Sequence, residues 1–230
     1  MRRSEVNQII RDAQSFIDRF SFKLPPFFHW SPTQLQARIQ SCPSIHANRL
    51  GWDVTDFGEG RFKDYGLFLL TIRNGQVADL AKGKGVVYAE KLLISRDKQM
   101  SPMHRHNLKT EDIINRGGGK LVLELYMAKP DGSIDSEAEV RVMTDAVERR
   151  FKPGTKLVLE PGESVTLFPN HWHAFWGDGD VLIGEVSSVN DDLTDNIFRE
   201  KIGRFSKIDE DEPPLHLLVS DYDSWLQGQG

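Results

Sequence analysis

From about Tyr65 onwards the sequence consists of short runs rich in Leu, Val, Ile and aromatic residues, separated by turn residues roughly every ten positions. This pattern is typical of chains that form many short β-strands. The expected strands are VVYAEKLLIS, KLVLELYMA, EVRVMT, TKLVLEP, SVTLFP, HAFW and DVLIGEVSS, with RGGG, PDGS, KPG, PGE and GDGD among the expected turns. The spacing predicts a mainly β fold, a barrel or sandwich of the jelly-roll kind.

The segment GLFLLTIRNGQVADL opens this region and carries its own turn signal. Asn-Gly between two apolar runs strongly favours a two-residue hairpin turn, because both residues tolerate positive φ. The sequence therefore predicts a strand, a turn at Asn74 and Gly75, and a second strand that pairs with the first.

The N-terminal part of the chain has a helical pattern. Its apolar residues recur at three- and four-residue spacings, which is the period of an amphipathic helix. These residues are Val6, Ile9, Ile10, Ala13, Phe16, Ile17 and Phe20. Ser31 and Pro32 form the N-cap and first-turn pair that favours a second helix. We expect a helical N-terminal extension over residues 1–60, packed on a β-barrel over residues 61–220 that holds the metal and catalytic site, and a tail over residues 221–230.

Composition and charge narrow the class of protein. Apolar residues make up 39% and charged residues 27% of the chain, as in ordinary globular proteins. The net charge is −5 and the Lys and Arg residues are scattered, so the basic footprint of a nucleic-acid binder is missing. No apolar run approaches the roughly 20 residues that cross a bilayer, and the first residues lack a secretory apolar core. Cys42 is the only cysteine, which favours a reducing compartment. We expect a cytoplasmic protein with no nucleic-acid or membrane partner.

The segment PMHRHNLKTEDI carries a candidate metal site. His104 and His106 are two residues apart, so on a strand both side chains leave the same face. Glu111 follows His106 at an odd spacing, so the chain must turn between them, at NLKT, and the glycines from Gly117 to Gly119 end the segment. Two imidazoles and a carboxylate suit a divalent ion such as Mn, Fe, Co, Ni or Zn.

A fourth ligand is expected from FPNHWHAFW, the only other histidine-dense segment. His171 and His173 share one strand face, and spacing alone does not choose between them. The remaining histidines, His29, His46 and His216, lack such neighbours and are expected to be structural.

These motifs resemble those of the cupin family. HRHNLKTEDIINRG fits the first cupin motif through His104, His106, Glu111 and Gly118, and PGESVTLFPNHWH is similar to the second. Several further blocks, among them LGWDVTDFG, YAEK, EDIINRGGG, HAFW and GEVSSVNDD, together resemble the D-lyxose isomerase family over nearly the whole chain. The resemblance implies a cupin β-barrel sugar isomerase that is a homodimer, uses Mn²⁺ and interconverts an aldose and a ketose. It also implies His173 as the fourth ligand.

Aldose–ketose isomerisation moves a proton between neighbouring carbons through a cis-enediol, which requires a base above these carbons. If HAFWGDGDVLIGE is a symmetric hairpin centred on Gly179, Glu185 lies opposite His173 and faces the same side. Glu185 is therefore the expected base. Lys109 lies on the turn between two ligands, where its amine would either exchange a proton or remain a cation beside the enediolate. The resemblance carries a lysine at this place and implies a catalytic role.

Three residues are expected to bind the substrate. Lys91 lies in YAEKLLIS, a run that is apolar on both faces and predicts a buried strand. Hydrogen bonds to sugar hydroxyls would explain a lysine there, and snorkelling to the barrel rim is the alternative. Arg204 lies in a block that resembles the family, and Trp176 could offer an apolar surface to a sugar ring.

Two other functions are compatible with these features. Fe²⁺ in the same ligand set would suit a cupin dioxygenase, whereas a non-catalytic sugar-binding cupin would tolerate loss of Lys109 and Glu185. The leading interpretation is an isomerase that uses Mn²⁺, with Co²⁺, Ni²⁺, Fe²⁺ or Zn²⁺ as alternatives. Its expected small-molecule substrates are D-lyxose and D-xylulose, and also D-mannose and D-fructose.

Overall fold

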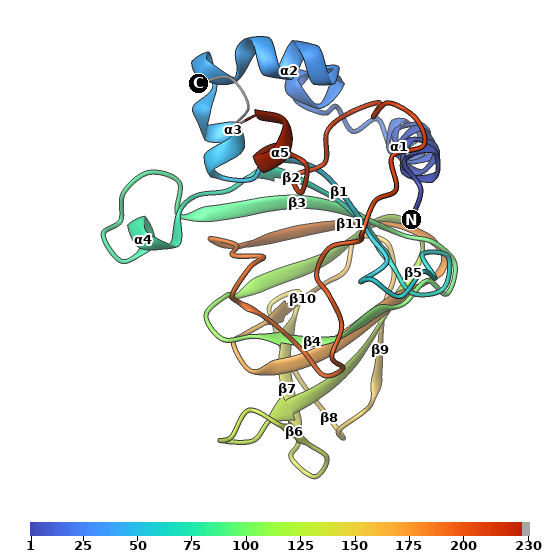
Figure 1. Cartoon of the computed structure of the whole chain (residues 1–230). Helices are drawn as coiled ribbons and strands as arrows, with labels where there is room; N and C mark the ends of the chain where they lie inside the picture. Colours follow the sequence, from blue (N-terminus) through green and yellow to red (C-terminus); the bar gives the residue numbers. More distant parts are fainter. Residues whose placement is uncertain (227–230) are drawn as a thin grey trace.

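The computed structural model describes residues 1–226, which form a mainly β fold with helices gathered over one side (Figure 1). The helices are α1 (Arg3–Asp18), η1 (Pro26–His29), α2 (Pro32–Arg38), η2 (Ile39–Ser41), α3 (Pro43–Ala47), α4 (Val77–Leu80) and α5 (Tyr222–Leu226). The strands are β1 (Gly51–Thr55), β2 (Leu67–Arg73), β3 (Tyr88–Ser95), β4 (Ser101–His106), β5 (Glu111–Ala128), β6 (Ile134–Asp135), β7 (Val140–Thr144), β8 (Val147–Phe151), β9 (Lys156–Leu159), β10 (Ser164–Leu167), β11 (His171–Ser188) and β12 (Asn196–Phe198).

Two long strands, β5 and β11, pair with each other and with most of the neighbouring strands of the barrel. They pair antiparallel from His171 opposite Met127 to Ser187 opposite Glu111. The last part of β11 also pairs with β3, and its first part pairs with β4. Likewise, β5 pairs with β10 at its start and with β9 further along. Each long strand therefore changes partners along its length within one 12-stranded sheet that curves around a common core, which confirms the predicted jelly-roll fold.

The glycine-rich segments RGGG and GDGD lie within these long strands, so the prediction that they form turns is wrong. Gly117 and Gly118 have φ angles of 146° and 96°, and the register with β11 shifts between Asp178 and Val181. A Cβ at Gly118 would lie 2.2 Å from the Asp180 carbonyl oxygen, so this position requires glycine. The glycines allow the paired strands to bend together as the sheet curves around the core.

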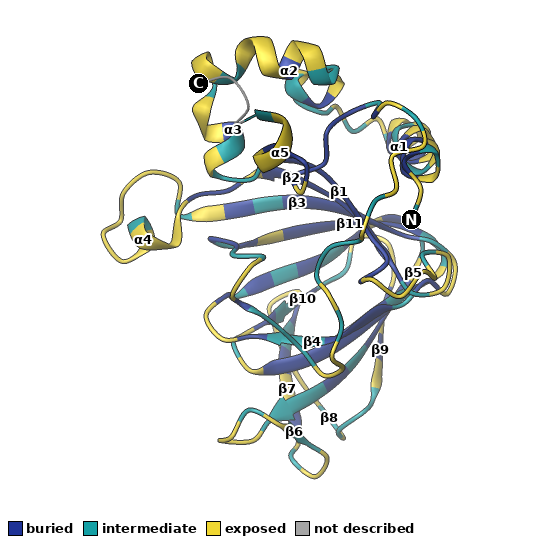
Figure 2. Cartoon of the chain, viewed as in Figure 1, coloured by how far each residue is buried: buried dark blue, intermediate teal, exposed yellow. Residues whose placement is uncertain are grey.

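Apolar layers cover both faces of β1, β2 and β3. The inner faces of the sheets enclose the main core, in which Leu121 and Leu123 are fully buried. The outer face of β1, β2 and β3 packs against α1 through Val6 and Ile10. Because both faces are covered, β2 is buried at every residue except Arg73 (Figure 2). Helix α1 therefore packs on the outer face of these strands.

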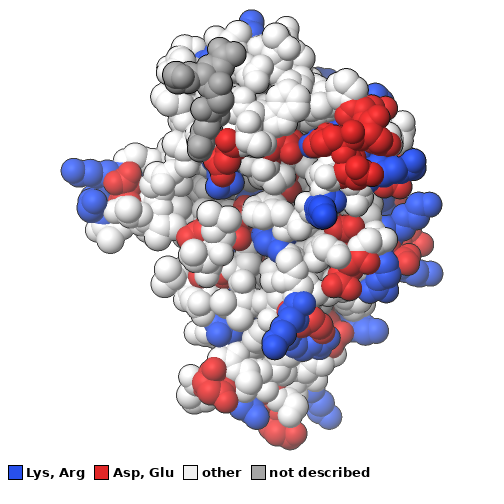
Figure 3. All heavy atoms as spheres, in the orientation of Figure 1, with Lys and Arg blue, Asp and Glu red and all other residues white. Residues whose placement is uncertain are grey.

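A buried arginine joins the start of α1 to the C-terminal segment. The Arg3 side chain is fully buried. It donates to Glu210 through Nε and Nη2 at 2.8 and 2.6 Å, and to Asp221 through Nη1 and Nη2 at 3.0 and 2.9 Å. Figure 3 shows acidic side chains gathered beside α1 on this face. Charge-assisted bidentate bonds of this kind hold the acidic segment IDEDEPP against the first helix.

The predicted hairpin at Asn74 and Gly75 is wrong. β2 pairs with β3, and α4 stands where the second hairpin strand was expected. The buried Asn74 side chain donates to the backbone carbonyls of Asn48 and Asn190 at 3.3 and 3.0 Å, and accepts from the Asn190 N–H at 2.9 Å. These long-range hydrogen bonds use the asparagine that the local pattern assigns to a tight turn.

Two of the expected region boundaries differ from the structure. β1 lies within the range 1–60 and pairs with β2, so the sheet begins inside the segment expected to be helical. The expected tail includes α5, where Tyr222 is buried and donates to the Leu50 carbonyl at 2.6 Å. Residues 227–230 of that tail lie outside the described residues. Among the described helices, none has both the length and the apolar character needed to cross a bilayer.

Candidate metal and catalytic site

A cavity inside the barrel brings together most of the predicted site residues. Its wall comes from β2, β3, β4, β5 and β11 and from the segment between residues 192 and 204. The charged and histidine side chains of this wall are Lys91, His104, His106, Lys109, Glu111, His173, Glu185, Asp192 and Arg204. Apolar side chains of the core complete the wall, so these polar groups interact in surroundings of low dielectric constant.

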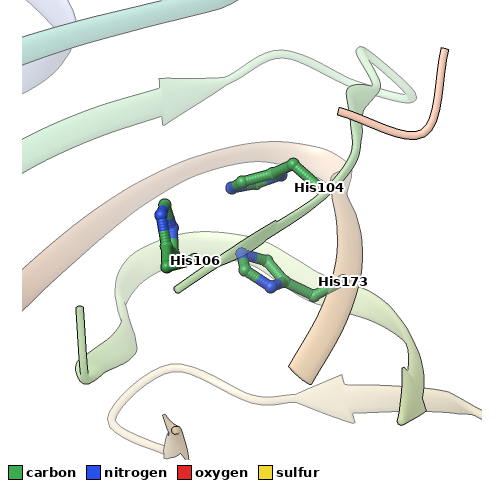
Figure 4. A group of neighbouring side chains, drawn as sticks. All are labelled: His104, His106 and His173. Atoms are coloured by element: carbon green, nitrogen blue, oxygen red, sulfur yellow. The ribbon is translucent and has the colours of Figure 1, made fainter. Parts of the chain in front are cut away.

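Three histidines form a cluster in this cavity. His104 and His106 lie on β4, and His173 lies on β11 directly opposite His104. Figure 4 shows the three rings gathered around one space. One nitrogen from each ring can be chosen so that all three lie within 4.8 Å of one another, which is close enough to share one ion.

Hydrogen bonds define the tautomer of each ring. Each Nδ1 faces a backbone carbonyl oxygen, which can only accept, so Nδ1 carries the proton and Nε2 presents a lone pair. The acceptors for His104, His106 and His173 are the carbonyls of Pro102, Asp195 and His171, at 2.8, 3.1 and 3.1 Å. Burial lowers the pKa of His104 and of His106 below the ordinary value, which favours the neutral rings.

Glu111 adds a carboxylate to the cluster. Its Oε1 lies 3.4 Å from His106 Nε2 and 3.2 Å from His173 Nε2. These three atoms are buried and have no hydrogen-bond partner among the described residues. With neutral rings all of them are acceptors, so none can donate to another. A divalent cation would satisfy them together, and the residues present therefore fit a metal ion held by three imidazoles and one carboxylate.

The other histidine of β11 is engaged elsewhere. His171 Nδ1 accepts the N–H of Phe168 at 2.9 Å, and its Nε2 lies 3.0 Å from the Arg141 carbonyl oxygen. Both ring nitrogens are therefore occupied away from the cluster. The alternative that spacing left open is thus decided by geometry in favour of His173.

A chain of alternating charges runs from the cluster along the cavity wall. Lys109 Nζ lies 2.6 Å from Glu111 Oε2 and 2.9 Å from Glu185 Oε1. Glu185 Oε1 lies 3.7 Å from Lys91 Nζ, which lies 3.6 Å from Asp192 Oδ1. The two expected catalytic residues are therefore in direct contact, beside the candidate metal ligands.

The series of alternating charges ends at Asp53. Neither Asp53 nor Asp192 was predicted as a site residue from the sequence. Arg204 Nη2 lies 3.3 Å from Asp192 Oδ1 and 2.8 Å from Asp53 Oδ2. Even so, Arg204 Nη1 and both Asp53 oxygens are buried without a well-oriented hydrogen-bond partner in the described chain. Burial raises the pKa of Asp53, against the opposing effect of Arg204. The one sequence signal for Asp53 is a carboxylate in the short β-prone run GWDVT.

Lys91 and Lys109, the two lysines in this series of alternating charges, are held inside the barrel. Burial alone would lower the pKa of Lys109, but the carboxylates of Glu111 and Glu185 outweigh it and raise that pKa above the ordinary value. Lys91 is only 4% exposed and donates to Asn190 Oδ1 at 2.6 Å. Of the two alternatives for Lys91, snorkelling to the rim is therefore wrong.

Two predictions about β11 need correction. Glu185 reaches the cavity because β11 is one bent strand paired with β3 and β5, and the hairpin centred on Gly179 is wrong. Trp176 does not line the cavity. Its ring lies 5.4 Å from Lys156 Nζ, whereas the adjacent Phe175 lines the cavity, as strand alternation requires.

The chain is similar in sequence and in fold to known sugar isomerases. The sequence model of the D-lyxose isomerase family matches residues 1–222. A D-lyxose/D-mannose isomerase of Serratia proteamaculans is 46% identical over 226 residues, covering 96% of this chain and 98% of the relative. The enzyme of the same name from Escherichia coli O157:H7 is 43% identical over 228 residues, with coverage of 96% and 98%. The crystal structure of Cellulomonas parahominis L-ribose isomerase with L-ribose is similar in fold, with a TM-score of 0.60 at 15% identity over 91% of this chain and 98% of that chain.

Proposed function

This chain belongs to the D-lyxose isomerase family, and from that membership we propose that it interconverts D-lyxose and D-xylulose, and also D-mannose and D-fructose. The chain is a sugar isomerase; the particular sugars are the proposal. The names of the two bacterial relatives support both sugar pairs. D-Mannose shares the configuration of D-lyxose at C2, C3 and C4, so a site that contacts these carbons would accept both aldoses.

One observation carries the proposal: buried, unpaired acceptor atoms on His106, Glu111 and His173 lie next to a paired Lys109 and Glu185. This arrangement supports an ion held by His104, His106, Glu111 and His173. We propose Mn²⁺, as the family resemblance implies, although Co²⁺, Ni²⁺, Fe²⁺ and Zn²⁺ also accept such nitrogen and oxygen ligands. When bound, the ion would stabilise negative charge on the two substrate oxygens and so make the proton at C2 more acidic.

Glu185 is the proposed base. Its contacts with Lys109, Ser187 and Lys91, at 2.9, 3.3 and 3.7 Å, all use Oε1, so Oε2 can take the proton from C2 of the aldose. The electrons of the C2–H bond then form the C1–C2 double bond of a cis-enediol while O1 gains a proton. Return of the proton from Glu185 to C1, with transfer of the O2 proton to the Lys109 amine that has donated to O1, gives the ketose and restores both side chains. The Lys109 ammonium, in contact with Glu185, is placed to donate to the oxygen that gains charge.

The distal end of the charge chain is the proposed binding site for the other hydroxyls. Lys91, Asp192 and Arg204 supply donors and acceptors on one wall, and Asp53 lies behind Arg204. Buried groups with unused hydrogen-bonding capacity discriminate well between sugars, because a missing hydroxyl leaves them unpaired. Trp176 is not part of this proposed binding site, because it does not line the cavity.

The first test is D-lyxose conversion by chelator-treated protein under anaerobic conditions, with and without added Mn²⁺. The expected result is D-xylulose formation only with Mn²⁺, and in D₂O the product should carry deuterium at C1, because the proton exchanges on Glu185. A Glu185→Gln variant tests the proposed base. Its control is Glu160→Gln, because the Glu160 side chain is exposed. Absence of turnover despite Mn²⁺ binding would contradict the proposal, and a requirement for oxygen would favour a dioxygenase.

Two further parts of the proposal rest on the family resemblance and on composition. We propose a homodimer, and a cytoplasmic location that accords with a single cysteine. Sedimentation analysis and fractionation of cells would test them.

A further inference from the structure

We propose that Asp195 is a positioning residue that holds Lys109 and the candidate ligand His106 in their working geometry. This inference rests on the proposed isomerase function, since it concerns the same cavity. Asp195 is 6% exposed and immediately precedes β12. Local sequence patterns give no signal for Asp195, because its partners lie more than eighty residues earlier in the chain.

The Asp195 carboxylate organises the turn between β4 and β5. Its Oδ1 accepts the backbone N–H groups of Asn107 and Leu108 at 2.9 and 3.0 Å, and its Oδ2 accepts that of Lys109 at 3.0 Å. Three consecutive N–H groups directed at one carboxylate form an anion nest. The turn that the odd spacing between His106 and Glu111 requires is therefore built around this side chain.

The same residue orients one ligand of the cluster. His104 and His173 each donate Nδ1–H to the carbonyl two residues earlier on their own strand, so local backbone geometry sets their rings. His106 differs, because its Nδ1 donates to the carbonyl of Asp195, 89 residues away in sequence. Outer partners of this kind fix the orientation of a ligating histidine.

Asp195 also secures a segment that supplies part of the cavity wall. β12 pairs with β4, with Asn196 opposite His106 and Phe198 opposite His104. Both Asn196 and Phe198 line the cavity. The bonds of Asp195 thus connect this segment to the turn that carries Lys109. Loss of the carboxylate should let the lysine and the ring of His106 move relative to Glu185, even if the barrel stays folded.

The experiment compares Asp195→Asn and Asp195→Ala with wild type, using Mn²⁺ binding to metal-free protein, kcat and KM for D-lyxose, and thermal unfolding. In Asp195→Asn one oxygen can still accept from Asn107 and Leu108, but the amide would face the Lys109 N–H donor. At saturating Mn²⁺ we expect kcat to fall about tenfold in Asp195→Asn and further in Asp195→Ala, with KM little changed. Mn²⁺ affinity should fall about tenfold in Asp195→Ala.

Asp135→Asn is the matched control, because Asp135 accepts the N–H groups of Glu137 and Ala138 at 2.9 and 3.0 Å in a turn outside the cavity. It should leave kcat and Mn²⁺ affinity unchanged. Retention of kcat within about twofold in folded Asp195 variants would overturn the positioning of Lys109, even if their melting temperature falls. Unchanged Mn²⁺ affinity in Asp195→Ala would overturn the effect on His106. If Asp195→Ala does not fold, both readouts are taken from Asp195→Asn. Failure of wild type to convert D-lyxose would instead refute the proposed function, and Mn²⁺ affinity would still test the role of Asp195.

Discussion

Two arginines in this chain each face two carboxylates, the fully buried Arg3 and Arg204, whose side chain is 12% exposed, and they differ in how completely they are paired. Arg3 donates through all three side-chain nitrogens to Glu210 and Asp221, at distances from 2.6 to 3.0 Å. Arg204 contacts its two aspartates through Nη2 alone, and its buried Nη1 has no hydrogen-bond partner in the described chain. The first cluster is complete in itself. The second keeps a donor on Arg204 and acceptors on Asp53 without a hydrogen-bond partner in the described chain, next to the cavity that Arg204 and Asp192 line.

An unpaired buried polar atom costs about 1–3 kcal/mol, so a folded chain rarely keeps several of them without another use. Here the unpaired buried side-chain atoms among the described residues all belong to His106, His173, Glu111, Asp53 and Arg204. Completeness of pairing therefore separates the groups that hold the fold from those prepared for a ligand. Substitutions in the two clusters should affect different measurements, stability in one and activity in the other.

The largest expected effect is that of Glu185→Gln on turnover. The amide keeps the size of the side chain but cannot accept the C2 proton, so kcat should fall about 10³-fold, within the usual range for loss of a general base. Glu185 makes no contact with the histidines, so Mn²⁺ affinity should stay close to that of wild type. Steady-state kinetics at saturating Mn²⁺ and a Mn²⁺ titration measure the two quantities. A kcat within about tenfold of wild type would show that another residue is the base.

Arg3→Met should have the next largest effect, on stability. Removal of one partner from a buried ion cluster leaves the side chain of Asp221, which is 10% exposed, without its counter-charge, at a cost of about 3 kcal/mol. Activity per folded molecule should be unchanged. Urea unfolding and kinetics test both statements. Arg2→Met is the matched control, because Arg2 is exposed and its ion pair with Glu5, at 3.6 Å, should contribute little. Equal destabilisation by both variants would contradict a structural role for the Arg3 cluster.

Arg204→Lys should weaken substrate binding and leave stability unchanged, the reverse of Arg3→Met. Its effect should also be smaller than that of Arg3→Met. Lysine keeps the charge but cannot contact Asp53 and Asp192 and also donate to a sugar through a planar fork. We expect KM for D-lyxose to rise about tenfold, with little change in kcat or in urea unfolding. Arg199→Lys, at a half-exposed position of the same segment, is the control. Loss of stability without a change in KM would place Arg204 with Arg3 as a structural residue.

Much of this arrangement could be predicted from the sequence, and most of the failures share one physical cause. Strand alternation and helix periodicity are local, so they correctly indicated the β-barrel and the N-terminal helix, and they predicted that His104 and His106 share one face of a strand. Glu185 was placed near the expected metal ligands by a hairpin that does not exist; its position in the structure depends on a bend in β11 opposite Gly118.

Residues held by long-range contacts were missed or misassigned. Asp53 and Asp192 join the site through Arg204, and Asn74 was assigned to a turn because its partners lie far away in the chain. The error at Trp176 has another cause, since strand alternation from His173 already predicts that Phe175, and not Trp176, faces the cavity. Local patterns therefore predict elements, but tertiary hydrogen bonds and ion pairs can be found only in the structure.

The smallest expected effect is on the pH dependence of stability, and it tests the Arg3 cluster. Hydrogen bonding to Arg3 lowers the pKa of Glu210 in the folded state, despite partial burial. A carboxylate with a lowered folded pKa stabilises the fold above its unfolded pKa of about 4.3, and this stabilisation is lost as pH falls through the folded pKa. Because the Glu210 side chain is 51% exposed, its contribution should not exceed about 1 kcal/mol. Urea unfolding of wild type and Glu210→Gln at neutral pH and at a pH below the folded pKa measures it. The variant should be less stable than wild type at neutral pH, and the two should converge in acid. A constant difference across this range would mean that the carboxylate charge is not what Arg3 binds, and the contrast with Arg204 would then depend on Asp221 alone.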